Sequence, residues 1–138
     1  MTKVLFDVTV VLDVLLDRQP QVEASASAFA AVESGGVQGY LAAHAVTTIH
    51  YLIRKEMPAS KARGVLSAIL RVFHVARVDG DVIREALDLR CPDFEDAVTA
   101  ASARAGQCDF IVTGDVKGFH GSPVRCLTPA ALLPLLKV

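Results

Sequence analysis

The alternation of short β-prone runs with segments of helical periodicity constrains the fold of this chain most strongly. Apolar runs at residues 3–6, 37–42, 75–78, 109–113 and 124–127 predict five short strands. Between them, apolar residues recur at helical spacing, as at Val10, Val11, Val14 and Leu15. Strands that alternate with helices form a mostly parallel sheet covered on both faces. The sequence therefore predicts an α/β/α three-layer sandwich, with residues 1–138 as a single domain.

Local start and stop signals set the expected helix ends. Gln19-Pro20 ends the first helix, and Gly35-Gly36 closes the second, which spans residues 22–34. Further helices are expected at residues 46–55, 60–73, 79–89 and 94–104. Thr128 followed by Pro129 predicts the start of a C-terminal helix.

Composition narrows the range of functions. The chain is 52% hydrophobic and 21% charged, so it can bury a sizeable core. Its net charge of −1 excludes a broad basic surface, and any binding of nucleic acid needs a local basic rim. The three cysteines match no zinc or redox motif, which favours small buried thiols in a reducing cytoplasm. Without an apolar stretch long enough for a signal peptide or membrane span, we expect a cytoplasmic protein.

Three carboxylates fall where such a fold places its active site, beyond the carboxyl ends of the strands. Asp7 directly follows the first predicted strand, and Asp115 lies two residues after the fourth. Asp96 lies in the first turn of a helix, and Asp93 lies three residues earlier on the same face. We therefore expect Asp7, Asp96 and Asp115 to share one crevice, with Asp93 nearby.

Carboxylates that converge in one crevice repel each other, and a hard divalent cation removes that penalty. Mg²⁺ or Mn²⁺ prefers oxygen ligands, acidifies its bound water and stabilises charge on a phosphoryl oxygen. Phosphodiester hydrolysis is the chemistry that this set favours. On the residues alone, structural roles remain open, because Asp93 suits a helix N-cap and Asp13, Asp17 and Glu95 suit surface or structural positions.

Two other enzyme or signalling classes fit parts of the pattern. The segment Phe6-Asp7-Val8-Thr9 suggests a haloacid-dehalogenase-type phosphatase, which needs a second aspartate where Thr9 stands. A phospho-receiver domain would instead use Asp7, Asp79, Thr113 and Lys117. The receiver interpretation leaves Asp96 and Asp115 without a role.

The ordered set of motifs resembles the PIN domain family. In that family a first strand leads into Asp-x-Asn and an apolar helix, which corresponds here to Asp7-Val8-Thr9 and the residues that follow. The family's third acid begins a helix, as in Asp93-Phe94-Glu95-Asp96, and its last motif is similar to Thr113-Gly114-Asp115. The likeness extends over nearly the whole chain in matching order.

This resemblance implies a parallel sheet between helices, a Mg²⁺- or Mn²⁺-dependent ribonuclease acting on RNA, and catalytic, metal-binding residues at Asp7, Asp96 and Asp115, with Asp93 as a further ligand. Many small bacterial members are toxins paired with an antitoxin protein, and a homodimer is expected. Two positions depart from the family pattern: Thr9 replaces its asparagine, and Thr48 stands where its second acid usually falls. A PIN-fold binding module with impaired catalysis is therefore the alternative.

Five further residues are expected to bind or orient substrate. Thr9, Thr48 and Thr113 offer hydroxyls beside the predicted carboxylates. His44, at the end of the second predicted strand, could act as a base or contact substrate, although a structural role competes. Lys117, two residues after Asp115, is the strongest candidate for the basic rim, to which Arg18, Arg54, Lys55 and Arg90 could also belong.

Overall fold

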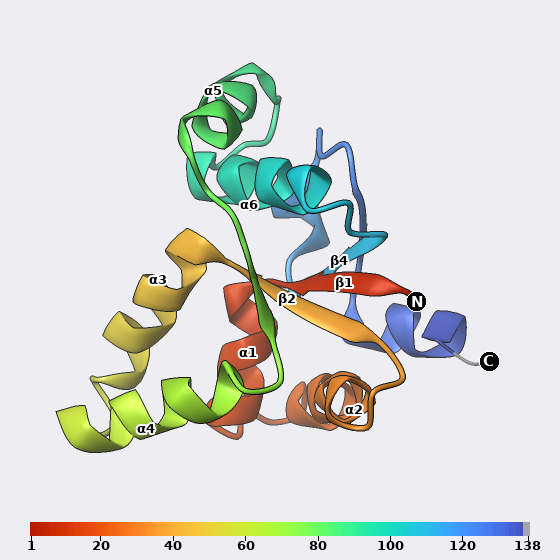
Figure 1. The fold of residues 1–138 in the computed structure, drawn as a ribbon. Coiled ribbons are helices and arrows are strands. Elements are labelled where there is room, and N and C mark those ends of the chain that lie inside the picture. The colour runs from red at the N-terminus through yellow and green to blue at the C-terminus, as the bar shows by residue number, and fades with distance from the viewer. Residues whose placement is uncertain (137–138) are drawn as a thin grey trace.

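A sheet of five parallel strands forms the centre of the computed structural model, which describes residues 1–136 (Figure 1). The strands are β1 (Lys3–Phe6), β2 (Gln38–Ala42), β3 (His74–Ala76), β4 (Phe110–Val112) and β5 (Arg125–Leu127). Their order is β3-β2-β1-β4-β5, and every pairing is parallel. Strands β2 and β3 lie on one side of β1, and β4 and β5 lie on its other side. The carboxyl ends of β1 and β4 therefore meet where the strand order reverses, the usual place for a site in such sheets.

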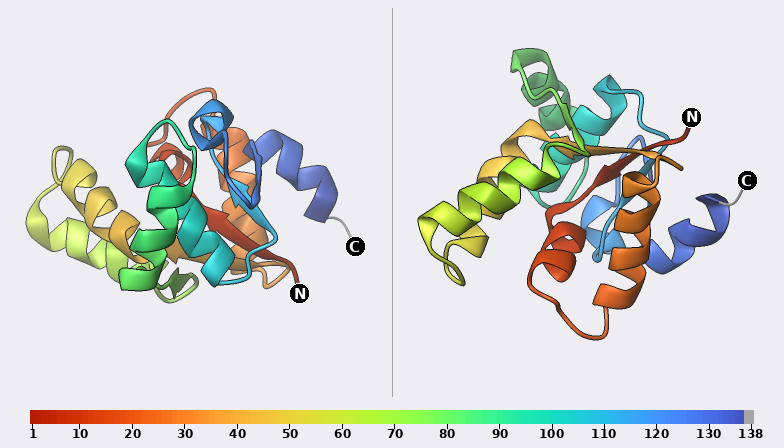
Figure 2. Two further views of the ribbon diagram at one scale, coloured as in Figure 1. Left: turned by 90° about the horizontal axis from the view of Figure 1, so that it is seen from above. Right: turned by 60° about the horizontal axis from the view of Figure 1, so that its bottom comes forward.

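Helices cover both faces of the sheet, which confirms the predicted three-layer α/β/α fold (Figure 1). One face carries α1 (Val8–Leu15), α2 (Val22–Glu33), α3 (Ala43–Ile53) and α4 (Ala59–Ile69). The short α7 (Pro129–Leu132) and the 3₁₀ turn η2 (Leu133–Leu136) lie beside α2 on that face (Figure 2). The other face carries α5 (Gly80–Asp88), α6 (Phe94–Ala105) and the 3₁₀ turn η1 (Val116–Phe119). Among residues 1–136, no helix has the length and apolar character needed to cross a membrane.

The alternation of side chains along β1 divides the core between the two layers. Val4 and Phe6 pack with α1, α2 and α3, whereas Leu5 packs with α6 on the opposite face. The rings of Phe29 and Phe73 lie 5.6 and 5.1 Å from the Phe6 ring, both edge-on, a geometry that stabilises aromatic clusters. These contacts anchor β1, so the residue that follows it starts from a rigid strand.

Two helix boundaries differ from the sequence expectation. Helix α3 begins at Ala43 rather than at residue 46, because Ala42 holds the N-cap position without any side-chain cap to mark it. Helix α4 ends at Ile69, so Phe73 reaches the core from the following turn instead of from a helix. The predicted caps at Thr128, Asp79 and Asp93 each accept a hydrogen bond from a backbone amide. The three cysteines are free thiols, as expected, and Cys108 is buried.

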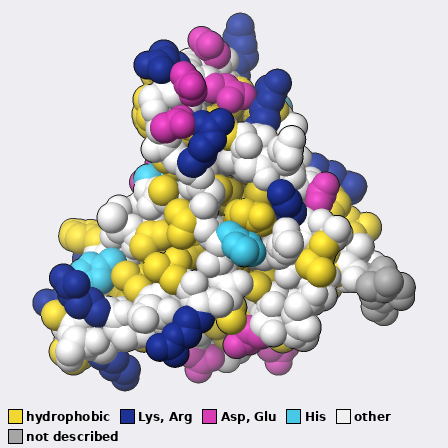
Figure 3. Space-filling view, in the orientation of Figure 1, with side chains coloured by type: hydrophobic (Ala, Val, Ile, Leu, Met, Phe, Trp, Pro, Cys, Tyr) yellow, Lys and Arg dark blue, Asp and Glu magenta, His cyan; other side chains and the backbone are white. Residues whose placement is uncertain are grey.

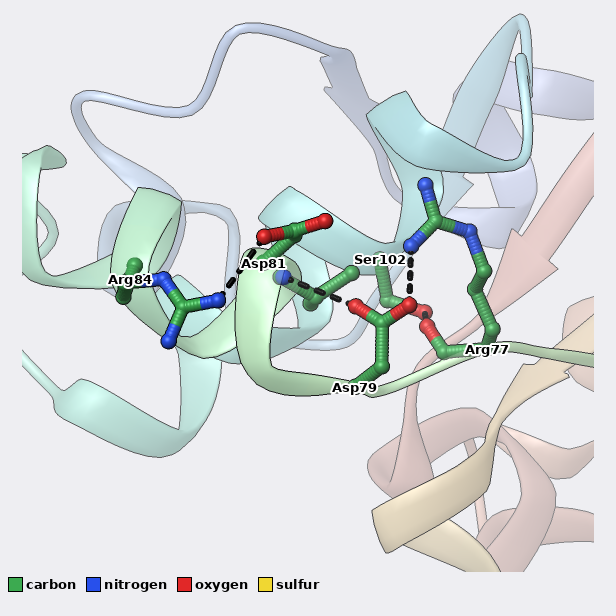
Figure 4. Close-up of polar contacts among 6 residues, drawn as sticks. Arg77, Asp79, Asp81, Arg84 and Ser102 are labelled. Atoms are coloured by element: carbon green, nitrogen blue, oxygen red, sulfur yellow. Dashed lines mark hydrogen bonds and ion pairs between the residues drawn. The ribbon is translucent and has the colours of Figure 1, made fainter.

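The approach to α5 is held by polar contacts (Figure 4). The Asp79 carboxylate accepts a hydrogen bond from the Val82 amide at 3.1 Å and pairs with Arg77. The Ser102 hydroxyl, on α6, donates to the Arg77 carbonyl at 2.8 Å. The Val82 hydrogen bond, helped by the Arg77 guanidinium, lowers the pKa of Asp79. Asp79 therefore serves as a helix cap that joins α5 to α6.

Candidate functional site

Asp7 follows the central strand β1, and only 8% of the residue is exposed. Its Oδ2 atom accepts hydrogen bonds from the hydroxyls of Thr113 at 2.8 Å and Thr9 at 2.9 Å. Although Asp7 occupies the N-cap position of α1, its side chain makes no capping hydrogen bond. Helix capping therefore does not explain this carboxylate, which two hydroxyls hold in one orientation.

The hydroxyls of Thr9 and Thr113 join the ends of β1 and β4. Thr9 Oγ1 accepts a hydrogen bond from the Gly114 amide at 2.9 Å, and Thr113 Oγ1 accepts one from the Asp115 amide at 3.0 Å. Each hydroxyl uses its single hydrogen on Asp7. Thr9 and Thr113 thus orient Asp7 and link it to the loop that carries Asp115.

Asp96 reaches the same edge of the sheet from the first turn of α6. Its backbone amide donates to the Asp93 Oδ1 atom at 3.2 Å, so Asp93 caps the helix that presents Asp96. Burial raises the pKa of Asp96 to about 7, with further contributions from the negative charges of Asp7, Asp93, Glu95 and Asp115. Asp7 and Asp115 therefore lie close enough to Asp96 for their charges to act on its carboxyl group.

Asp115 and Asp96 share the space beside Gly118. Asp115 is the N-cap of η1, and its Oδ1 atom lies 3.4 Å from the Gly118 amide. A methyl group at Gly118 would lie 2.7 Å from Asp96 Oδ2 and 3.1 Å from Asp115 Oδ2. Both carboxylates therefore contact one small volume, which only a residue without a side chain leaves open.

The donor set in this space suits a hard cation. Asp7, Asp96 and Asp115 offer only oxygen atoms, the ligands that Mg²⁺ and Mn²⁺ prefer. In residues 1–136, however, no three acidic, histidine or cysteine side chains already surround a single point as metal ligands do. Binding an ion would require the carboxylates to close around it by side-chain rotation.

Thr48 contributes no charge to this space. It lies half-buried on α3, and its hydroxyl is 3.5 Å from the His44 carbonyl oxygen one turn earlier. The contact is at the limit of a hydrogen bond and turns the hydroxyl back onto its own helix.

His44 reaches α6 across the sheet edge. Its Nε2 atom lies 3.3 Å from the hydroxyl of Thr99, which in turn donates to the Glu95 carbonyl at 3.1 Å. Since the single hydroxyl hydrogen of Thr99 is used on Glu95, the hydroxyl oxygen of Thr99 is left to accept a hydrogen bond from His44 Nε2. The Nδ1 atom of His44 is buried and has no partner in the described part of the chain. Thr99 lies three residues after Asp96, so His44 is oriented beside the helix of the acidic residues.

Two residues of this site have no motif in the sequence. Gly118, which gives space to two carboxylates, is three residues after Asp115, and Thr99 is three residues after Asp96. Helical spacing from a predicted acid is the signal that could have identified both. Lys117, the predicted member of a basic rim, is exposed on η1, two residues after Asp115.

The sequence pattern of the PIN domain matches residues 3–117 of this chain. The chain belongs to the PIN domain family. The match runs from β1 into the first half of η1, and thus includes every carboxylate described above. No curated protein sequence matches the chain.

Solved structures share the fold of this PIN domain. FitAcB from Neisseria gonorrhoeae has 20% identity and a TM-score of 0.71, with 92% of this chain and 98% of that chain covered. VapBC2 from Rickettsia felis, bound to a promoter DNA fragment, has 11% identity and the same coverage and TM-score of 0.71. VapC20 from Mycobacterium tuberculosis, described as a toxin that cleaves the sarcin–ricin loop, has 17% identity, a TM-score of 0.65, and 88% and 98% coverage.

Membership of the PIN family removes the basis for the two competing classes. Asp79, the phospho-acceptor of the receiver hypothesis, is occupied as the cap of α5. The phosphatase hypothesis needs an acid at Thr9, whose hydroxyl instead orients Asp7.

Proposed function

We propose that this PIN domain is a divalent-metal-dependent ribonuclease that acts as the toxin of a toxin–antitoxin pair. The observation that carries the proposal is the convergence of Asp7, Asp96 and Asp115 beyond the ends of β1 and β4. Crowding of their charges helps to raise the pKa of Asp96 to about 7. Carboxyl groups whose ionised forms are destabilised by crowding are typical of sites that bind a cation or carry out catalysis.

In this proposal Asp7, Asp96 and Asp115 hold one Mg²⁺ or Mn²⁺ ion, and Asp93 supports Asp96. The bound ion would supply an acidified water and offset charge on a phosphoryl oxygen. Thr9 and Thr113 hold Asp7 in position, so that only Asp96 and Asp115 need to adjust. Lys117, an exposed cation, would contact RNA beside Asp115. His44, whose Nδ1 atom is buried, would act through α6, where its Nε2 atom contacts Thr99.

The second candidate is a PIN-fold binding module that has lost catalysis. Two observations favour it: Thr48 supplies no acid, and among residues 1–136 no ligand group is preassembled. Both predict weak metal affinity. Substrate phosphate would add the missing negative charge, so weak affinity in the free protein is compatible with activity.

A nuclease assay separates the two candidates. The full chain is incubated with labelled single-stranded RNA in Mn²⁺ or in EDTA, together with Asp7→Asn and the control Asp88→Asn, an exposed acid on α5. The ribonuclease proposal predicts Mn²⁺-dependent cleavage that Asp7→Asn reduces about 100-fold or more and that Asp88→Asn leaves unchanged. RNA that stays intact in Mn²⁺ would favour the binding module.

An antitoxin protein, and a second copy of the chain, complete the proposal. A similar structure from Klebsiella pneumoniae is described as a toxin–antitoxin complex, which supports a protein partner here. Hydrophobic side chains gather near the centre of the face seen in Figure 3. Around the edge strand β3, Leu70, Val72 and Val75 are exposed by 42%, 40% and 48%. This apolar surface is available for an interface, and we propose a cytoplasmic homodimer.

A further inference from the structure

A hollow of about 440 Å³ lies beside η1, next to the acidic residues but not among them. None of its lining residues is acidic; they are Val116, Lys117, Phe119, His120, Gly121, Ser122, Val124, Arg125 and Cys126. Lys117 and Arg125 are cationic, His120 offers a ring N–H, and Val116 and Val124 add apolar surface. In a chain of net charge −1, this is a local concentration of positive charge.

The turn η1 forms a wall shared by the hollow and the carboxylates. Gly118 faces Asp96 and Asp115, whereas its neighbours Lys117 and Phe119 line the hollow. A chain of phosphates that passes the carboxylates would therefore continue along η1 toward the hollow.

The cations at the hollow are available to a ligand. The ion pairs of residues 1–136 use Arg77, Arg84 and Arg104, and neither Lys117 nor Arg125 takes part in one. The Arg125 guanidinium is instead positioned over the Phe110 ring, at 6.0 Å from its centroid. A cation without a carboxylate partner retains its full attraction for phosphate.

We propose that this hollow is a nucleotide-binding subsite for single-stranded RNA, a role that rests on the proposed ribonuclease function. Lys117 binds the phosphate next to the one at the carboxylates, and Arg125, at the start of β5, binds a further phosphate. The base packs against the apolar side, where Val116 is 39% exposed. The volume lies within the range that holds a small ligand. Phosphate contacts of this kind position a strand without selecting its sequence.

The test measures binding without cleavage. A short fluorescein-labelled single-stranded RNA is titrated in EDTA, with fluorescence anisotropy as the readout, against wild type and Lys117→Ala/Arg125→Ala. The matched control is Lys61→Ala/Arg71→Ala, which removes one lysine and one arginine, both exposed, from α4 and the turn after it. Melting curves check that all three proteins are folded.

The subsite variant is expected to bind roughly tenfold more weakly than the control at low salt, with a salt slope shallower by about 1.4, or about 0.7 per lost phosphate contact. Equal affinity and equal slope in the two double variants would overturn the subsite, as would absence of RNA binding by wild type. Cleavage by wild type in Mn²⁺ tests the ribonuclease proposal separately. RNA cleavage with an unchanged KM in Lys117→Ala/Arg125→Ala would overturn the subsite alone.

Discussion

Acidic residues occupy two contrasting settings in this molecule. Around α5 each of three acids pairs with an arginine, and charges of both signs lie side by side on the surface (Figures 3 and 4). The pairs are Arg77–Asp79, Arg84–Asp81 and Arg104–Glu85. Exposed pairs of this kind contribute about 0–1 kcal/mol each to stability.

At the ends of β1 and β4, the acids have each other as neighbours instead. Asp7, Asp96 and Asp115 form no ion pair with a basic side chain of residues 1–136, and Asp7 is buried. Together with burial, the negative charges of these neighbours raise the pKa of Asp96. The number of acidic residues therefore does not identify a functional site. A functional site is indicated where acidic residues lack basic partners and lie close together despite their mutual repulsion.

Filling the space that the carboxylates share should have the largest effect. Gly118→Ala places a methyl group 2.7 Å from Asp96 Oδ2 and 3.1 Å from Asp115 Oδ2, so the two groups must separate. We expect Mn²⁺ affinity, measured by titration calorimetry, to fall about tenfold or more.

The matched control is Gly64→Ala, in the middle of α4, where an added methyl group meets nothing within 4 Å. It should raise the free energy of unfolding by about 0.5–1 kcal/mol and leave Mn²⁺ affinity unchanged. Equal Mn²⁺ affinity in Gly118→Ala and wild type would show that the space beside Gly118 is not where the ion binds.

Restoring an acid should sharpen the contrast between the two settings. If Thr48 holds the vacant ligand position, Thr48→Glu should raise Mn²⁺ affinity by roughly three- to tenfold and increase any ribonuclease activity. Thr47→Glu, on the exposed neighbouring position, is the control and should change neither. An unchanged Mn²⁺ affinity in a folded Thr48→Glu protein would mean that the vacant position is assigned wrongly.

The repulsion at Asp96 should make stability depend on pH. Its pKa rises from 3.8 to about 7 on folding, so the folded state holds the proton more tightly than the unfolded state. The free energy of unfolding of the metal-free protein should therefore decrease as the pH rises from about 4 to about 7, and level off above. Because Asp96 is half-buried, we expect a change on the order of 1 kcal/mol.

Chemical denaturation in EDTA at a series of pH values measures this dependence. Asp96→Asn should flatten it, whereas Asp81→Asn, which removes a paired acid on α5, should leave it in place. A slope that persists in Asp96→Asn would assign the effect to another group.

Breaking a paired acid should have the smallest effect. Arg84→Ala removes the exposed partner of Asp81, and we expect the free energy of unfolding to fall by less than about 0.5 kcal/mol. A decrease of about 2 kcal/mol or more in the free energy of unfolding, measured by thermal melting, would mean that the ion pairs around α5 are required for stability. The paired acids would then no longer differ from the unpaired ones as described.

The general architecture was predictable because periodicity is local. Alternating strand and helix patterns fixed the layers, and the rule for carboxyl ends of parallel strands indicated where Asp7 and Asp115 lie. The start of α3 at Ala43 was not predictable, since Ala42 carries no capping side chain. A local sequence pattern predicts a helix end only when a capping residue, a glycine or a proline lies there.

The detail of the site depends on contacts between distant residues. The Thr113 hydroxyl meets Asp7 across a sequence separation of 106 residues, and His44 meets Thr99 across 55. No periodicity encodes such pairings. The sequence therefore identified the candidate acids, whereas the space at Gly118 and the unpartnered Nδ1 of His44 emerged only from the fold.

Titration calorimetry with Mn²⁺ tests the central claim most directly. Wild type is compared with Asp7→Asn, Asp96→Asn and Asp115→Asn, and with Asp88→Asn as the control for loss of one negative charge. If the three unpaired carboxylates share a cation, wild type binds one Mn²⁺ weakly, each of the three variants loses about tenfold or more in affinity, and Asp88→Asn binds like wild type. Mn²⁺ binding that survives unchanged in all three variants, or its absence from wild type, would contradict the account.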